Sequence, residues 1–157
     1  MSQKIRVLYV DDEINNLVSF KANFRYLYEI FTASSACEGL DIIGKEDIHV
    51  VVTDQRMPGI KGVAFLELVT EQYPDLVKMV LTGYSDIEAI IDAVNKGHIY
   101  KYITKPWNSK ELVEAIGECY DVYFGNVEKR DVISKLKQSN EQLELILREK
   151  LISKLCN

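Results

Sequence analysis

The sequence is poor in the residues that build disulfide frameworks and thiolate metal sites. Its 157 residues include three cysteines and two histidines. Cys37, Cys119 and Cys156 are an odd number at wide spacings, which argues against a disulfide framework or a zinc site and predicts reduced thiols. His49 stands at the start of an apolar run and His98 follows a helical pattern, so we expect both to be structural.

Long hydrophobic runs and an excess of basic residues are also missing. No run approaches the roughly 18 apolar residues of a membrane span, and no signal-peptide pattern is present, so we expect a cytoplasmic protein without a membrane partner. Acidic residues outnumber basic residues 24 to 19, for a net charge of −5. This balance argues against direct nucleic-acid binding by this segment. The chain is long enough for one ordinary domain and an appendage.

Strand-like apolar runs alternate with helical patterns through residue 105. We expect strands near residues 5–10, 28–32, 49–53, 77–82 and 100–104, and helices near residues 14–26, 35–44, 62–72 and 86–96. Asp86 can cap the fourth of these helices and Gly97 can end it in the left-handed conformation. Asn108 and Glu111 form a pattern like a capping box, which predicts the start of a fifth helix. Such alternation predicts an α/β fold with a parallel sheet covered on both faces.

Four of the apolar runs end on side chains suited to phosphate or metal chemistry. The residues are Asp11 and Asp12 after the first run, Asp54 after the third, Thr82 after the fourth and Lys105 after the fifth. Ligands of open parallel sheets bind outside the carboxyl ends of the strands. We therefore expect these side chains to converge on one small site, although they are far apart in sequence.

Three carboxylates in one small site imply a cation. Two like charges about 4 Å apart repel by roughly 4 kcal/mol at an effective dielectric near 20. Oxygen ligands without a neighbouring histidine or cysteine favour Mg²⁺. Asp54 follows the most apolar run and is the best-placed nucleophile for an acyl phosphate. Thr82 and Lys105 are suited to bind phosphoryl oxygens.

The four motifs together resemble the receiver domain of a bacterial two-component response regulator. The motifs are Val10-Asp11-Asp12-Glu13, Thr53-Asp54-Gln55-Arg56-Met57-Pro58-Gly59, Leu81-Thr82-Gly83-Tyr84 and Tyr102-Ile103-Thr104-Lys105-Pro106-Trp107. The resemblance covers about residues 4 to 122. It implies a doubly wound, five-stranded parallel sheet of the flavodoxin-like type with strand order 2-1-3-4-5.

The resemblance also implies a chemistry for the acidic residues. Asp54 would accept a phosphoryl group from a phosphohistidine on a sensor histidine kinase or phosphotransfer protein. Asp12 and Asp54 would bind Mg²⁺ directly, Asp11 would assist through water, and the backbone carbonyl of Arg56 would complete the protein ligands.

Further residues take switching or neighbouring roles by the same resemblance. Thr82 would move toward the new phosphoryl group, Tyr102 would change rotamer with it, and the Lys105–Pro106 bond would be cis. Arg56 and Tyr84 lie two residues past Asp54 and Thr82. We hypothesise that the bulk of these two side chains controls how fast water reaches the acyl phosphate.

Two other functional classes are compatible with parts of this pattern. A phosphatase of the haloacid-dehalogenase-like type also forms an aspartyl phosphate, but it usually carries a second aspartate two residues past the nucleophile, where this chain has Arg56. A non-phosphorylated receiver scaffold is disfavoured because the full set of site residues is present. We expect a signalling switch that catalyses only its own phosphorylation and dephosphorylation.

The last part of the chain has a different character, so we divide it into a receiver domain at 1–122 and a helical extension at 123–157. From residue 126 onward there is no proline or glycine. Apolar residues recur at near-heptad spacing, with interruptions at Asn140 and Lys150. The pattern fits a coiled-coil linker or dimerisation helix, or a helix packed on its own domain. Gly125 leaves open whether one helix continues or a second begins.

Overall fold

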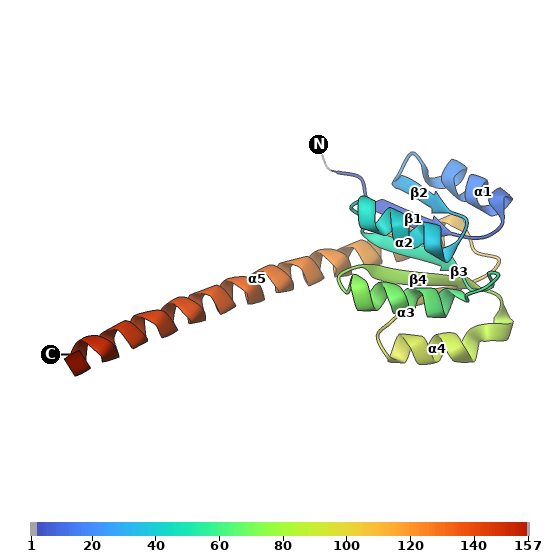
Figure 1. Ribbon diagram of the computed structural model, residues 1–157. Coiled ribbons are helices and arrows are strands. Elements are labelled where there is room, and N and C mark those ends of the chain that lie inside the picture. Colours follow the sequence, from blue (N-terminus) through green and yellow to red (C-terminus); the bar gives the residue numbers. More distant parts are fainter. Residues whose placement is uncertain (1–2, 157) are drawn as a thin grey trace. The chain divides into compact units, whose positions relative to one another are not determined.

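The computed structural model describes residues 3–156, apart from the side chain of Tyr84 (Figure 1). The strands are β1 (Arg6–Val10), β2 (Glu29–Ala33), β3 (Val50–Asp54), β4 (Val77–Thr82) and β5 (Lys101–Thr104). The helices are α1 (Ile14–Phe24), α2 (Ala36–Lys45), α3 (Gly62–Gln72), the 3₁₀ turn η1 (Tyr84–Asp86), α4 (Ile87–Asn95) and α5 (Ser109–Cys156). The expected alternation of strands and helices is confirmed.

The strands form one parallel sheet in the order β2-β1-β3-β4-β5. This order confirms the flavodoxin-like topology. Val10 pairs with Thr53, Asp54 with Leu81, and Thr82 with Thr104 across neighbouring strands. The polar residues at or just past the ends of β1, β3, β4 and β5 therefore lie at one edge of the sheet.

Each face of the sheet carries its own hydrophobic core. One core joins the sheet to α1 and to the first part of α5, through residues such as Phe20, Phe24 and Ile116. The other joins the sheet to α2, α3 and α4, through residues such as Phe65 and Ile90. Figure 1 labels α2, α3 and α4, the helices that pack against this second core. Because β3 and β4 are buried along their whole length, the strand that ends at Asp54 has little freedom to move.

The helix ends confirm two expectations and correct one. Gly97 follows α4 with a φ of 81°, and the Glu111 N–H donates to Asn108 Oδ1 at 2.7 Å. The Lys105–Pro106 bond is cis. Asp86 occupies the N-cap position of α4, but its side chain makes no capping hydrogen bond. The predicted capping role of Asp86 is wrong because its carboxylate is bonded to Arg56 instead.

The chain divides into two compact units, Met1–Tyr123 and Phe124–Asn157. Helix α5 is continuous from Ser109 to Cys156, so of the two alternatives left open at Gly125 the single continuous helix is the one observed. Every side chain from residue 128 to 156 is exposed. The apolar residues of this segment include Val132, Ile133, Leu136, Leu143, Leu145, Ile146, Leu147, Leu151, Ile152 and Leu155. Within the described part of the second unit, nothing covers these apolar side chains.

The cysteines and histidines occupy ordinary positions. Cys37 and Cys156 are exposed, whereas Cys119 lies in the core, where burial raises the pKa of its thiol to about 12. His49 is buried and accepts a hydrogen bond from the Arg6 N–H at its Nδ1. The His49 ring also packs against Tyr120 and Tyr123 of α5.

Within residues 3–156, no helix combines the length and the apolar character needed to cross a bilayer.

Candidate functional site

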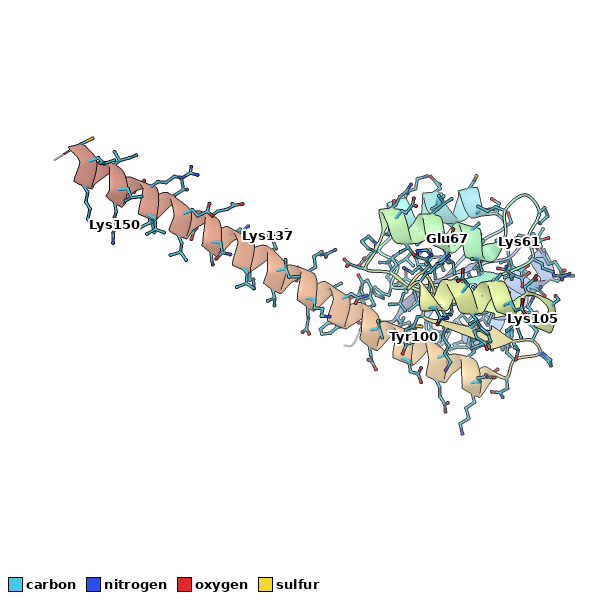
Figure 2. All side chains as sticks on the ribbon, turned by 90° about the horizontal axis from the view of Figure 1, so that it is seen from below. Lys61, Glu67, Tyr100, Lys105, Lys137 and Lys150 are labelled. Atoms are coloured by element: carbon cyan, nitrogen blue, oxygen red, sulfur yellow. The ribbon has the colours of Figure 1, made fainter. Side chains whose placement is uncertain are left out.

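The acidic side chains predicted to form the site do converge. One carboxylate oxygen from each of Asp11, Asp12 and Asp54 lies within 4.8 Å of the others. Lys105 follows β5 and donates from Nζ to Asp54 Oδ1 at 2.5 Å. Figure 2 shows Lys105 in the loop beyond β5, at the outer edge of the sheet. Residues from three different strand ends thus form one small polar site.

Asp54 lies in a conflicting electrostatic environment. The residue is 8% exposed, and this burial raises the pKa of its carboxyl group. The hydrogen bond and charge of Lys105 lower that pKa, while the carboxylates of Asp11 and Asp12 raise it again. The net direction is upward, which means that one lysine does not fully offset burial and two acidic neighbours. An additional cation would relieve this imbalance.

Asp11 is held in place by three donors. Its Oδ2 accepts from the Tyr9 hydroxyl at 2.7 Å and from Asn16 Nδ2 at 3.0 Å, and its Oδ1 accepts from the Glu13 N–H at 3.0 Å. Burial and the contact with Asp11 raise the pKa of the Tyr9 hydroxyl, so that it stays a donor. Asp12 is exposed beside this fixed carboxylate. Asp11 is therefore oriented by the fold, while Asp12 is open to solvent.

Sequence reasoning missed Tyr9 and Asn16 as members of the site. A strand places residues i and i+2 on the same face, and this alternation could have linked Tyr9 to Asp11. Asn16 lies on the first turn of α1, where its reach back to Asp11 depends on the path of the intervening loop. That path was not readable from the sequence pattern.

The donor set fits a hard divalent cation. The three clustered groups are carboxylates, and oxygen ligands of this kind suit Mg²⁺ better than softer metals. Burial, together with the charges of Asp11 and Asp12, raises the pKa of Asp54, and a bound cation would lower it. The acidic site of the first unit is thus suited to bind a metal ion.

The side chains of Thr82 and Tyr102 make their contacts outside the acidic cluster. Thr82 is 2% exposed and its Oγ1 donates to the Gly83 carbonyl at 2.9 Å. Tyr102 is half-buried on β5 and packs against the core beneath α2, α3 and α4. In this structure the hydroxyl of Thr82 is turned to the Gly83 carbonyl, and Tyr102 borders the hydrophobic core on one face of the sheet.

Arg56 has partners that the sequence did not indicate. Its Nε donates to Asp86 Oδ2 at 3.0 Å, and one of its terminal nitrogens donates to Ser85 Oγ at 2.6 Å. The side chain of Tyr84, predicted to border the site with Arg56, lies outside the described residues. Arg56 thus joins the loop after β3 to the segment before α4.

Gly62 is a further residue that the sequence analysis missed. A Cβ atom at Gly62 would lie 2.4 Å from the Asp54 backbone carbonyl and 3.0 Å from Gln55 Cα. The Gly62 N–H also donates to the Gln55 carbonyl at 2.9 Å. The first turn of α3 therefore packs directly on the backbone that carries Asp54, and a glycine permits this approach.

A cavity of about 310 Å³ adjoins the acidic site. It is lined by Tyr9, Asn16, Ser19, Lys105, Pro106 and Trp107. The ring of Trp107 also packs near Phe20 and Phe24 of α1. The single tryptophan of the chain consequently lies beside the lysine of the site.

Comparison with known proteins agrees with this arrangement. The family described as response regulator receiver domain matches residues 7–117, and the chain belongs to that family. It is 38% identical over 123 residues to the hydrogenase transcriptional regulatory protein HoxA of Bradyrhizobium diazoefficiens, covering 78% of this chain and 25% of that protein. HoxA of Cupriavidus necator is 36% identical over 143 residues, covering 87% of this chain and 30% of that protein. The chain therefore spans less than a third of the length of these curated relatives.

Solved structures show the same fold. A structure from Rhodopirellula baltica, described as an adenylate cyclase, superposes with a TM-score of 0.81 at 30% identity, covering 84% of this chain and 98% of that chain. A CheY-like receiver domain protein from Methanospirillum hungatei superposes with a TM-score of 0.71 at 32% identity, covering 79% and 98%. In both sequence and fold, the chain is therefore similar to receiver domains, which are signalling modules of two-component systems.

Proposed function

We propose that the chain is a phosphorylation-dependent switch in which Asp54 is the phosphoryl acceptor. The observation that carries this proposal is the contact of Lys105 with Asp54 inside the acidic cluster. Asp54 is the clustered carboxylate that this lysine contacts. Asp11 is occupied by three donors of its own, which favours Asp54 as the reacting group.

The proposed reaction transfers a phosphoryl group from a phosphohistidine of a sensor kinase or phosphotransfer protein. A carboxylate oxygen of Asp54 forms a bond to phosphorus, the phosphorus–nitrogen bond breaks, and its electron pair returns to the imidazole. Water later attacks phosphorus, releases inorganic phosphate and restores the carboxylate. Both steps develop charge on the phosphoryl oxygens, so positioning and charge neutralisation supply most of the catalysis.

Each residue of the site would have its own role in this phosphoryl transfer. Asp12 and Asp54 would hold Mg²⁺ directly, Asp11 would act through water, and the Arg56 carbonyl would complete the protein ligands. When bound there, Mg²⁺ would supply positive charge that offsets the charge of the phosphoryl oxygens. Lys105 would bind a phosphoryl oxygen with its ammonium group, and the Thr82 hydroxyl would leave Gly83 to bind another. Tyr102 would then repack beside the displaced segment.

The alternative functions are less well supported. A haloacid-dehalogenase-like phosphatase needs a general acid two residues past its nucleophile, and this chain has Arg56 there, bonded to Asp86 and Ser85. An unphosphorylated scaffold has no need for a lysine held on a buried aspartate. We therefore propose a switch and not an enzyme that acts on an external substrate. Unpaired thiols favour the cytoplasm as its location.

Intact-mass measurement after incubation with Mg²⁺ and acetyl phosphate tests this proposal. We expect a gain of one phosphoryl group that is lost in Asp54→Asn and in the presence of a chelator. Asp47→Asn, which changes an exposed aspartate outside the site, is the matched control and should still gain the group. Turnover of acetyl phosphate without a mass gain would support the phosphatase, and no reaction would support the scaffold.

We also propose that the second unit pairs with a second copy of the chain. A row of exposed side chains, four of them apolar, follows one face at alternating spacings of three and four residues: Ile133, Leu136, Asn140, Leu143 and Leu147. That spacing defines a coiled-coil seam, in which a single asparagine fixes register by pairing with its equivalent. Such a pairing requires a second copy.

Sedimentation of the full chain tests the dimer. Leu143→Glu lies on the seam and should shift the population toward monomer. Leu145→Glu is a matched control because Leu145 is equally exposed, at 58%, but lies off the seam. A monomer for the unchanged chain, with and without phosphorylation, would contradict the proposed pairing.

A further inference from the structure

We propose that Arg56 is a positioning residue that tethers the segment between Thr82 and α4 to the loop that follows Asp54. By holding this segment, Arg56 opposes the movement of Thr82 toward a phosphoryl group. The inference rests on the proposed function of Asp54 and Thr82, and it adds a restraint built from Arg56, Ser85 and Asp86.

The tether is defined by two hydrogen bonds from one guanidinium group. Arg56 Nε donates to Asp86 Oδ2 at 3.0 Å, and a terminal nitrogen donates to Ser85 Oγ at 2.6 Å. Arg56 is separated from these partners by 30 and 29 residues in sequence. Because a guanidinium is planar, two simultaneous bonds fix both the distance and the orientation of the bonded segment.

Asp86 takes part in this tether in place of its expected local role. Aspartate at an N-cap normally accepts a hydrogen bond from the first turn of its helix. Asp86 stands at that position before α4, makes no such bond, and has a side chain only 17% exposed. The Arg56 side chain is 71% exposed, so it reaches across the surface to a largely buried carboxylate.

Thr82 is joined to the same segment from its other end. The Thr82 hydroxyl donates to the Gly83 carbonyl, and Gly83 precedes η1, which contains Ser85 and Asp86. The hydroxyl must leave Gly83 before it can bind a phosphoryl oxygen on Asp54. A segment held at Ser85 and Asp86 resists that rearrangement.

Phosphorylation would weaken the tether by competition. A phosphoryl group on Asp54 carries up to about two negative charges in place of the single charge of the carboxylate, and its oxygens match the donor geometry of arginine. Arg56 is two residues away in sequence and exposed, so it can exchange Asp86 for the new anion. Since exposed ion pairs are weak, we expect the tether to shift the switching equilibrium by about two- to fivefold.

Binding of beryllium fluoride, a phosphoryl mimic, tests the tether in the Mg²⁺-loaded full chain. Fluorine NMR measures the apparent Kd directly. Asp86→Ala releases Arg56 without removing its charge, and we expect binding to tighten about two- to fivefold. Glu88→Ala is the matched control, since it removes the same charge from the first turn of α4 and should leave the Kd near that of the unchanged chain.

The dependence on Arg56 separates a tether from a general charge effect. In an Arg56→Ala background, Asp86→Ala should produce no further tightening, because its partner is already gone. Tightening of equal size in both backgrounds would overturn the proposal, as would an Asp86→Ala effect equal to that of Glu88→Ala.

Hydrogen exchange of the unliganded chain distinguishes failure of the tether from failure of the proposed function. Asp86→Ala should speed exchange of the backbone amides of residues 83–86, and Glu88→Ala should not. Unchanged exchange in Asp86→Ala would overturn the tether. If the unchanged chain binds no beryllium fluoride, the proposed function is contradicted, and so is the role of the tether in switching.

Discussion

Replacing Gly62 with alanine should disturb the proposed phosphorylation site through the backbone that carries Asp54. The new Cβ would lie 2.4 Å from the Asp54 carbonyl oxygen, whereas contacts under 3.0 Å are essentially never adopted by real Cβ atoms. The start of α3 or the end of β3 must therefore shift by at least about 0.6 Å, in a region where close packing leaves little slack. The atoms that must give way are backbone atoms, which cannot rotate aside.

The magnitude follows from two opposing terms. Overpacking of a well-packed region costs about 1–3 kcal/mol. Alanine at a helical position recovers about 0.5–1 kcal/mol through its lower backbone entropy in the unfolded chain. The expected net loss of unfolding free energy is up to about 2.5 kcal/mol, with a central value of about 1 kcal/mol. Because the shift falls on the backbone of Asp54, Mg²⁺ binding should weaken as well.

Urea unfolding followed by the fluorescence of Trp107 measures the stability change, and Mg²⁺ titration measures the site. Gly117→Ala is the control, since a Cβ at Gly117 in α5 meets nothing within 4 Å. It should raise stability by about 0.4–1 kcal/mol and leave Mg²⁺ binding unchanged. If Gly62→Ala proved as benign as Gly117→Ala, the argument from the close approach of α3 to Asp54 would be refuted.

Three other substitutions have defined outcomes. Gly125→Ala should add about 0.5–1 kcal/mol of helix stability, because Gly125 lies inside a continuous helix with free space around it. The helicity measured by circular dichroism should therefore rise, and lower helicity would contradict this. Asn108→Ala should cost about 1 kcal/mol in urea unfolding by removing the 2.7 Å cap on the Glu111 N–H, and an unchanged midpoint would count against the cap. Burial lowers the pKa of Lys78 to about 8, so below pH 8 the lysine is charged in both states and the folded state bears the full penalty. As pH rises from about 8 to 10.5 the unfolded chain binds more protons than the folded one, so stability rises. Lys78→Met should therefore be more stable at pH 7 by about 1–3 kcal/mol, and this advantage should vanish by pH 10.5; an advantage independent of pH would refute the assignment.

The sequence was most informative where one local pattern decides the structure. Asp11 and Lys105 directly follow strands and Asp54 ends one, and parallel strands deliver such residues to one edge of the sheet. Gly97 ends α4 as expected, because the left-handed conformation is a local preference of glycine. These features depend on neighbours in the chain and so could be predicted.

Features that depend on distant partners could not be predicted. Asp86 has the right chemistry and position for a helix cap, but Arg56 is bonded to its carboxylate from another loop. In the sequence, Gly62 is an ordinary first residue of a helix. A side chain at this position would clash with the end of β3, and this is evident only once α3 is placed against that strand. Gly125 was ambiguous because its intrinsic preference for helix ends is weaker than the helical preference of the residues around it.

The distribution of thiols gives the molecule two natural attachment points. Cys37 of the first unit and Cys156 of the second are both exposed. Cys119 is buried and its raised pKa leaves almost no thiolate at neutral pH, so it should be inert to alkylating reagents. A pair of spin labels or fluorophores can therefore be placed on the unmodified sequence, one on each unit. The separation between the two units, and any change in it on phosphorylation, becomes measurable in solution.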